Sequence, residues 1–296
     1  MNHTPTPELD TTALAHLQQW VGSSEELQDA IGAAPLHGLA ATLDRDDPLP
    51  MRGDAAPPLG HWLYFLPQTR QSQIGPDGHP KRGGFLPSVP LPRRMWAAGR
   101  LSWEPGNPLR VGDEARRHSR IESVTHKRGR SGEMVFVQVR HEVHNMHGLC
   151  VSEEQDLVYR AAPQPGEQPP APAAAPTGAA WRREIVPDDV LLFRYSALTF
   201  NSHRIHYDRR YVTEVESYPS LVVHGPLIAT LLVDLVQRHA PGRFVRRFEF
   251  RAVRPTFDLH PFHVNGAPSA DGQSVQLWAS DHEGWLTMQG SLQFEN

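Results

Sequence analysis

Strict alternation of apolar and polar residues marks the last third of the chain. Phe248, Phe250 and Ala252 are separated by charged residues, and the same period of two returns in residues 275–279 and 286–294. Successive side chains of a strand point to opposite faces, so this period is typical of strands with one buried face. We therefore predict three half-buried strands here.

A different period precedes these strands. From Gly225 onward, apolar residues stand at positions 228, 231, 232, 235 and 236, which is the spacing of an amphipathic helix. Pro241 and Gly242 follow and are expected to end it. One long helix followed by several antiparallel strands indicates an α+β fold in which a single sheet covers the helix.

The first half shows weaker versions of the same signals. Residues 14–21 and 27–43 have helical character. Residues 135–139 and 155–160 have the alternation of strands. Residues 75–84 are rich in turn-forming types, and no long amphipathic helix follows them. We interpret the chain as two related lobes, the first with its central helix shortened to about residues 93–98.

A compositional break separates the two halves. Residues 161–180 are rich in Pro and Ala, nearly uncharged and free of large apolar side chains. Such a segment buries too little surface to fold and favours extended conformations. The predicted organisation is an N-terminal lobe of residues 1–160, a linker of residues 161–180 and a C-terminal lobe of residues 181–296.

Composition narrows the class of protein. Apolar residues make up 39% of the 296 residues, and the net charge is -4 with both signs interspersed. The apolar content is sufficient for two cores, and the mixed charge argues against a general nucleic-acid binder. The single cysteine, Cys150, excludes an intrachain disulfide, and the chain shows neither a signal peptide nor a bilayer-length apolar run. We expect a cytoplasmic protein that binds neither nucleic acid nor membranes.

Three residues of the C-terminal half offer a set of chemical functions. His206 has an ordinary pKa near neutrality and is able to exchange a proton with water. Asn201 orients a water molecule but cannot serve as a base. Gly225 opens the apolar helix, where an unpaired amide and the helix dipole polarise a carbonyl oxygen. Base, water holder and oxyanion donor together suffice to hydrate an enoyl thioester.

Five stretches resemble one family. FRYSALTFNSHRIHYD (193–208) and YPSLVVHGPL (218–227) resemble the signature of MaoC-like, (R)-specific enoyl-CoA hydratases. HWLYFLP (61–67), GPDGHPKRGGFLPSVPLPRRMWAAGR (75–100) and EEQDLVYR (153–160) resemble the branch of mesaconyl-C4-CoA (3-methylfumaryl-CoA) and itaconyl-CoA hydratases. The resemblance spans nearly the whole chain apart from the linker and the first residues.

This resemblance implies a double hot-dog fold, in which each lobe wraps a sheet around a central helix. It also implies that His206 is the catalytic histidine and Gly225 the glycine at the helix start. The family pattern has an aspartate where this chain has Asn201. The departure places the proton transfer on His206, while Asp208, two residues further on, is an alternative carboxylate.

Four further residues are candidates for holding the acyl group. Arg93 or Arg94 is able to grip a free carboxylate with two hydrogen bonds, although a structural ion pair is the slightly preferred interpretation for these arginines. His224 and Tyr207 lie within the signature stretches and are predicted to contact the substrate.

A basic cluster near the predicted strands is the candidate for the phosphates of coenzyme A. Its central members are Arg246, Arg247 and Arg251, with Arg243 and Arg254 beside them. Arginines on an alternating strand also commonly face solvent alone, so both interpretations stay open here.

Metal binding and cofactor chemistry are not expected. His203 and His206 are three residues apart, but a zinc site needs three or four ligands and no further spaced ligand is evident. His203 is expected to support the loop by hydrogen bonding. Coenzyme A enters only as part of the substrate.

The sequence thus predicts reversible addition of water to an α,β-unsaturated acyl-CoA, a short branched dicarboxylic one such as mesaconyl-C4-CoA or itaconyl-CoA, by a homodimer. The alternatives are a 3-hydroxyacyl-thioester dehydratase of fatty-acid metabolism, a hot-dog thioesterase and a non-catalytic acyl-CoA-binding protein. Release of free CoA separates the thioesterase from the hydratase, and binding without turnover identifies the last.

Overall fold

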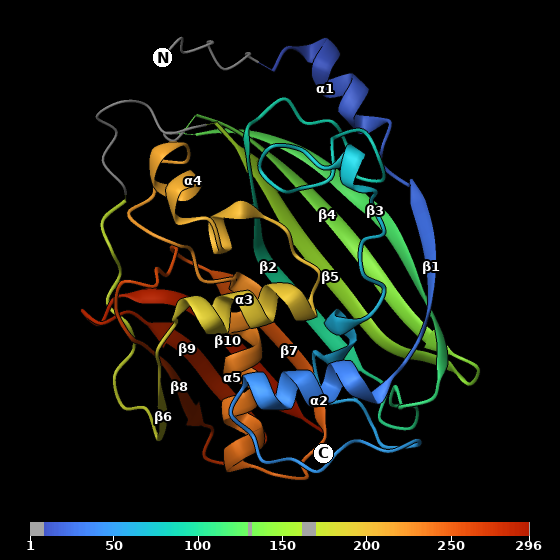
Figure 1. Cartoon of the computed structure of the whole chain (residues 1–296), viewed down its shortest axis with the longest axis vertical. Coiled ribbons are helices and arrows are strands. Elements are labelled where there is room, and N and C mark those ends of the chain that lie inside the picture. Colours follow the sequence, from blue (N-terminus) through green and yellow to red (C-terminus); the bar gives the residue numbers. More distant parts are fainter. Residues whose placement is uncertain (1–8, 130–131, 162–169, 296) are drawn as a thin grey trace.

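A single antiparallel sheet runs through the molecule (Figure 1). The computed structural model describes residues 9–129, 132–161 and 170–295. The strands of the first half are β1 (Ser24–Ala30), β2 (Arg93–Trp103), β3 (Glu114–Gly129), β4 (Gly132–Asn145) and β5 (Gly148–Arg160). Those of the second half are β6 (Trp181–Ile185), β7 (Val245–Ala252), β8 (Phe262–Pro268), β9 (Ser274–Ser280) and β10 (Leu286–Phe294).

The helices lie mainly on one side of this sheet (Figure 1). They are α1 (Thr11–Gln18), α2 (Ala33–Thr42), α3 (Asp189–Leu198), α4 (Arg209–Glu214) and α5 (Gly225–His239). Three short 3-10 turns accompany them: η1 (Gly60–Leu63), η2 (Gln71–Gln73) and η3 (Arg204–His206). None of these helices has the length and apolar character needed to cross a bilayer.

The order of the strands reveals a repeat. It runs β1-β3-β4-β5-β2-β7-β10-β9-β8-β6. Read from its far edge inward, the second half has the order β6-β8-β9-β10-β7, so each strand of the first half corresponds to the strand numbered five higher. The two halves meet where β2 pairs with β7, with Gly99 opposite Phe250. A Cβ at Gly99 would lie 2.5 Å from a ring carbon of Phe250, so glycine is needed for this approach. The predicted duplication is therefore visible in the topology, although the sequence shows no repeat.

The predicted strands and the long helix of the second half are present, but two predictions for the first half were wrong. Residues 93–98 do not form a shortened central helix, because they begin β2, which pairs with β5 on one side and β7 on the other. The stretch 27–43 is not one helix. Its first part belongs to β1, which pairs with β3, and α2 starts only after Gly32. In both places pairing within the sheet outweighs local helical character.

The described part of the predicted linker is held in place along part of its length. Residues 162–169 lie outside the described ranges, while Ala174 forms a β-bridge with Trp285 and Ala173 accepts a hydrogen bond from Leu286 N at 2.8 Å. This extended stretch thereby lies along the turn between β9 and β10.

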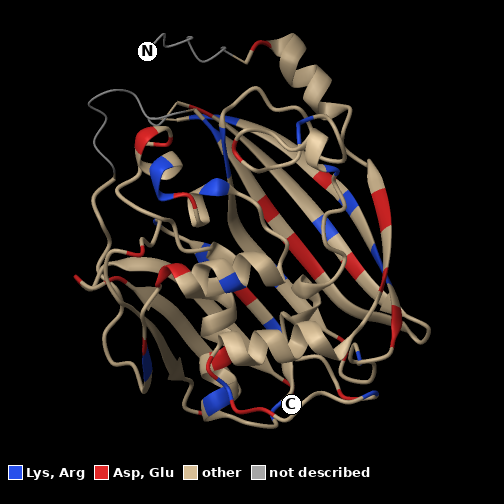
Figure 2. Cartoon of the chain, in the orientation of Figure 1, with Lys and Arg blue, Asp and Glu red and all other residues tan. Residues whose placement is uncertain are grey.

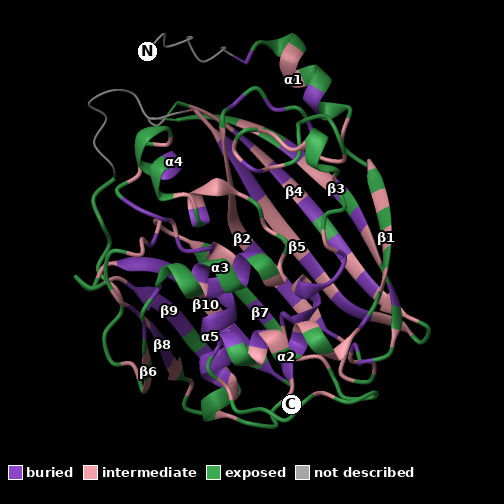
Figure 3. Cartoon of the chain, in the orientation of Figure 1, coloured by how far each residue is buried: buried purple, intermediate pink, exposed green. Residues whose placement is uncertain are grey.

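Helix α5 is the centre of the second half. Residues 227–236 are all buried, because the helix packs on β8, β9 and β10 while side chains from α3 and the first half cover its other face (Figure 3). One acid lies within this run. The Asp234 carboxylate, 1% exposed, accepts hydrogen bonds from Arg45 at 2.9 Å, Arg183 at 2.7 Å and Arg238 at 2.7 Å. Asp234 therefore joins the helix to β6 and to a loop of the first half.

Asp234→Asn is expected to destabilise the protein by about 3 kcal/mol, because it leaves three clustered guanidinium groups without their buried counter-charge. Urea unfolding followed by circular dichroism measures the change.

The matched control is Glu214→Gln, which breaks the exposed i,i+4 pair with Arg210. An exposed pair of this kind contributes about 0.5 kcal/mol or less. Equal unfolding midpoints for the two variants would contradict the role given to Asp234.

Candidate active site

A tight loop after α3, the signature loop of residues 199–206, carries the central part of the family-like stretch. Phe200 has a left-handed backbone with φ of 48°, and Asn201 N donates to the Ser196 carbonyl at 2.8 Å, so the chain turns back on the end of the helix. The side-chain oxygen of Asn201 accepts a hydrogen bond from His203 N at 3.0 Å. Asn201 thus shapes the turn that leads into η3.

The His206 ring is buried and fixed in one tautomer. Its Nδ1 lies 2.7 Å from the carbonyl oxygen of Val222, which only accepts, so Nδ1 must carry the proton and Nε2 has a free lone pair. Val222 N in turn donates to the carbonyl of Ile205 at 3.0 Å. The two loops are therefore pinned together at the point where His206 enters.

The start of α5 lies next to this ring. His224, the N-cap residue, stacks on His206 with ring centroids 3.8 Å apart, and Gly225 follows directly as the first helical residue. A Cβ built on Gly225 would meet no atom within 4 Å, so the backbone there borders open space. The structure thus brings His206 and the first amides of the helix to one place.

Two residues of α3, Tyr195 and Ser196, hold the ring of His224 in place. Its Nε2 lies 2.8 Å from Ser196 Oγ, and its ring meets Tyr195 edge-on at 5.2 Å. Its Nδ1 is buried without a hydrogen-bond partner in the described part of the chain. His224 therefore lies at the predicted site with one polar atom unsatisfied.

Two other residues of the signature point elsewhere. Tyr207 is exposed, and its hydroxyl donates to the Ser202 carbonyl at 3.0 Å. Asp208 caps α4 by accepting from Tyr211 N at 2.9 Å and pairs with Arg204 at 2.7 Å. With these contacts made, the structure gives Asp208 a helix-capping role.

A turn of the first half is docked onto the signature loop. Arg204 N donates to the carbonyl of Asp77 at 2.9 Å, and Ser202 Oγ donates to the carbonyl of Gly78 at 2.6 Å. Gly78 has φ of 88°, and a Cβ there would lie 1.8 Å from the Ser202 carbonyl oxygen. Only glycine allows this approach, so the contact between the lobes depends on Gly78.

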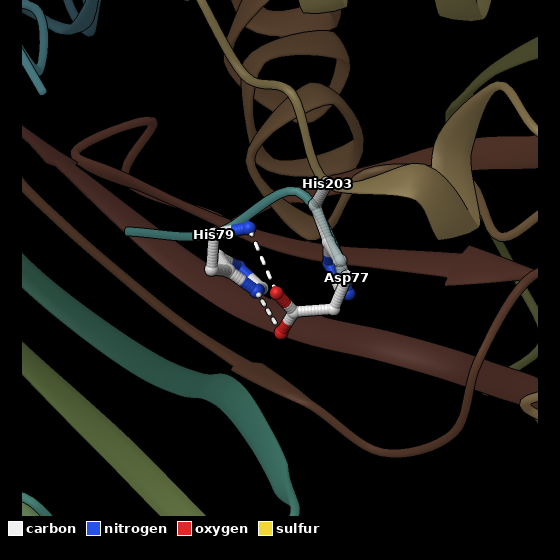
Figure 4. A group of neighbouring side chains, drawn as sticks. All are labelled: Asp77, His79 and His203. Carbon is white, nitrogen blue, oxygen red and sulfur yellow. Dashed lines mark hydrogen bonds and ion pairs between the residues drawn. The ribbon is translucent and has the colours of Figure 1, made fainter. Parts of the chain in front are cut away.

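This turn adds a carboxylate and an imidazole beside His203 (Figure 4). His79 Nδ1 lies 3.1 Å from Asp77 Oδ2, and His79 N donates to Asp77 Oδ1 at 3.0 Å. The His79 and His203 rings are 3.9 Å apart, and His203 meets His206 edge-on at 5.4 Å. Together with His224, four imidazoles form a continuous row.

Burial governs the protonation of this row. It lowers the pKa of His206 to about 4 and that of His203 to about 2, and it brings the pKa of His224 well below its usual range. Burial raises the pKa of Asp77, but the hydrogen bonds from His79 outweigh it and hold the carboxyl ionised. At neutral pH the site therefore contains neutral imidazoles and one carboxylate.

The two predicted substrate arginines differ in their surroundings. Arg93 donates to the Glu216 carbonyl at 2.7 Å and lies over the ring of Tyr218 at 4.8 Å, so it serves a structural contact. Arg94 lies close enough to His79 and His203 for its charge to lower the pKa of both rings. No salt bridge to Arg94 occurs among the described residues.

The predicted coenzyme A arginines are not brought to this place. Arg247 and Arg251 are exposed and alternate with the buried Phe248 and Phe250, so they project from the sheet face away from the core. There Arg247 lines a hollow together with Arg100, Glu154 and Glu249. Acidic and basic residues are interspersed along the strands of the sheet (Figure 2). Arg246 donates to the carbonyl of Trp103. Because alternate residues of a strand face opposite ways, the sheet separates Arg247 and Arg251 from His206.

One group of residues has the composition of a metal site. Ligand atoms of Asp77, His79 and His203 lie within 4.8 Å of one another, so the first half supplies two residues that the sequence did not place beside His203, and His206 is not a member of the group. One of the ligand atoms, His79 Nδ1, is engaged with Asp77.

Sequence reasoning missed Asp77 and His79. They are more than 120 residues away from the signature loop, and only the docking of the two halves brings them to it. The motif GPDGHP was recognised as rich in turn-forming residues, but no pattern in the sequence indicated which loop it contacts.

The comparisons with known proteins agree with this architecture. The structure matches a MaoC-like dehydratase from Phytophthora capsici with a TM-score of 0.68 at 14% identity, covering 96% of this chain and 99% of that one. A Mycobacterium tuberculosis protein with a double hot-dog fold matches with a TM-score of 0.52 at 13% identity, over 93% and 96%. The predicted double hot-dog fold of the α+β class is confirmed.

Sequence comparison then identifies the family. Residues 59–258 match hydroxyacyl-thioester dehydratase type 2, and the chain belongs to this family. It is 46% identical over 265 residues to mesaconyl-C(4)-CoA hydratase of Chloroflexus aurantiacus, covering 88% of this chain and 92% of that protein. It is 26% identical over 268 residues to the mitochondrial hydroxyacyl-thioester dehydratase type 2 of Schizosaccharomyces pombe, covering 80% and 88%.

Proposed function

We propose that the protein is a hydro-lyase that reversibly adds water to the double bond of a short, branched, dicarboxylic α,β-unsaturated acyl-CoA, with mesaconyl-C4-CoA as the leading candidate and itaconyl-CoA as the second. The observation that carries this proposal is the position of His206, a neutral imidazole stacked on His224, the N-cap residue of α5. The likeness to mesaconyl-C(4)-CoA hydratase supports the substrate class.

His206 provides the proton transfer. Its Nε2 takes a proton from water while the oxygen bonds to C3 of the substrate, and the electrons of the double bond move toward the thioester carbonyl. The imidazolium then returns the same proton to C2, and the thioester is restored. The fixed Nδ1–H bond to Val222 stabilises the imidazolium and keeps Nε2 directed at the water.

The start of α5 stabilises the charge that builds up on the thioester oxygen. The amide of Gly225 is among the first of the helix, where N–H groups have no partner within the helix. Aligned peptide dipoles add a favourable field for an anion at this end. Asn201 holds the loop and helps to place the water.

Arg94 supports the substrate class. This partly buried cation lies beside the imidazole row and hydrogen-bonds with the side chain of Tyr159, and it has no acidic partner among the residues described. A free carboxylate on the acyl group would complete a charge-assisted pair there. A plain monocarboxylic enoyl-CoA offers no such partner.

The remaining expectations form part of the same proposal. The reaction uses no metal, flavin or nicotinamide, coenzyme A is carried by the substrate, and the chain works in the cytoplasm as a homodimer. A second candidate reaction is dehydration of 3-hydroxyacyl thioesters of fatty-acid metabolism, which the family match favours. Chain-length preference separates the two candidates.

His206→Ala is expected to lower kcat for hydration by at least about 100-fold, because general base catalysis typically contributes 10²–10⁴-fold. Absorbance of the conjugated thioester follows the reaction over mesaconyl-C4-CoA, itaconyl-CoA, crotonyl-CoA and longer enoyl-CoAs.

The control for this variant is His37→Ala, which changes an exposed histidine of α2. Nearly full activity of His206→Ala would overturn the mechanism, and release of free CoA by the wild type would indicate a thioesterase.

Acid inactivation is expected only well below the ordinary histidine range. His206 must be unprotonated to accept a proton, and burial lowers its pKa to about 4. The value of kcat/KM should therefore stay level as the pH falls through 6.5 and decline only as it approaches 4. An initial-rate profile with stability checked at each pH measures this, and a half-maximal rate near pH 6.5 would contradict it.

Arg94→Met is expected to weaken use of the dicarboxylic substrate selectively. Losing a charge-assisted hydrogen bond costs about 1.5–3 kcal/mol, or roughly 10–100-fold in kcat/KM for mesaconyl-C4-CoA. Crotonyl-CoA, which has no second carboxylate, serves as the internal control. Equal losses for both substrates would show that Arg94 does not bind the carboxylate.

A further inference from the structure

The signature loop lacks a carboxylate at the position where the general MaoC pattern has one. That pattern has an aspartate where this chain has Asn201, whose side-chain oxygen is engaged by His203 N at 3.0 Å. An amide has no acid–base function at ordinary pH. The second group that would share the reacting water with His206 is therefore missing from this loop.

The turn of the first half brings a carboxylate to the same loop. Arg204 N and Ser202 Oγ both donate to backbone carbonyls of this turn, at 2.9 and 2.6 Å, and Gly78 permits a contact that any side chain would block. The turn itself is closed by Gly75 N, which donates to the carbonyl of His79 at 2.7 Å. Asp77 and His79 are thus held rigidly against the signature loop.

The pairing of Asp77 with His79 fixes the tautomer of the imidazole. A carboxylate only accepts hydrogen bonds, so the 3.1 Å contact requires the proton to be on His79 Nδ1 (Figure 4). The lone pair is then on Nε2. This is the same arrangement that the Val222 carbonyl imposes on His206.

The two imidazoles belong to one cluster. The His79 ring is 3.9 Å from that of His203, and the His203 ring is 5.4 Å from that of His206. His79 lies close enough to His206 for a charge on it to lower the pKa of His206. The loop docks on backbone carbonyls of the turn, and the turn is closed by a backbone hydrogen bond, so this docking does not depend on the imidazole of His79.

We propose that Asp77 and His79 supply the second group that holds the reacting water, taking the place that the general MaoC pattern gives to the aspartate at position 201. His79 Nε2 accepts a hydrogen bond from the reacting water while His206 removes the other hydrogen. Asp77 is a positioning residue, because it acts through His79.

This role adds no reactant to the proposed hydration, on which it rests. One proton passes from water to His206 and then to C2, the C3–O bond forms as the double bond is lost, and His79 ends the cycle with its lone pair free. In the dehydration direction the same two imidazoles receive the departing water.

His79→Ala is expected to lower kcat by about 100-fold with KM changed less than about 3-fold, and Asp77→Asn by about 10-fold. The matched control is His126→Asn, which breaks another histidine–carboxylate pair, with Glu133, on the hairpin of β3 and β4. This control should keep wild-type kinetics.

A second substitution in the His79→Ala variant distinguishes a role of His79 in holding the reacting water from a structural role. Asn201→Asp restores the carboxylate of the family pattern and still accepts from His203 N, so it should recover at least about 10-fold of the activity that His79→Ala loses. A loss that Asn201→Asp leaves unchanged would overturn the proposal, as would activity of His79→Ala within about 3-fold of wild type.

A metal ion would give a different result. If EDTA abolishes wild-type activity and Zn²⁺ restores it, Asp77, His79 and His203 hold an ion and the proposal is wrong. Activity that survives EDTA unchanged supports it.

Failure of the proposed function is recognised separately, as a wild type that hydrates no thioester. Nitrogen-15 NMR of labelled histidine then decides the present proposal. His79 should show a protonated Nδ1, and its Nε2 signal should shift when crotonyl-CoA is added. A protonated Nε2, or a signal unmoved by crotonyl-CoA, would overturn the assignment.

Discussion

The hydrogen bond from His206 Nδ1 to the carbonyl of Val222 is the contact on which the proposed chemistry depends. It fixes the tautomer, leaves Nε2 with a free lone pair and joins the signature loop to the segment that leads into α5. Because His224 stacks on the same ring, the base and the helix start share one place in the fold. Burial keeps the imidazole neutral, so the group is ready to accept a proton at ordinary pH.

The two halves of the chain have the same strand order but different tasks. The second half keeps a long, fully buried helix whose first amides face the base, and Asp234 anchors that helix through three arginines. The first half has the short helix α2 between its first two strands instead, followed by extended chain. That chain carries the turn of residues 75–79, so the loss of a central helix is accompanied by a contribution to the site from the other lobe.

Sequence periodicity predicted the second half well, because α5 and strands β7, β9 and β10 each have one clear apolar face. It failed at residues 93–98, where the relation to the second lobe suggested a shortened central helix but pairing with β5 and β7 imposes a strand. The motif and the helix start selected His206 and Gly225, which the structure places close together. Asp77 and His79 were not, since their link to His203 depends on the docking of two distant segments and no periodicity encodes it. Arg247 and Arg251 were assigned by charge, and only the sheet shows that they lie on its other face.

A crystal structure of the protein with a non-reactive dicarboxylic acyl-CoA tests the central claim most directly. The account predicts the thioester oxygen about 3 Å from the Gly225 amide, with the carbon that receives water next to His206 Nε2. A thioester seated on the opposite sheet face, against Arg247 and Arg251, or one separated from His206 by packed side chains, would contradict it.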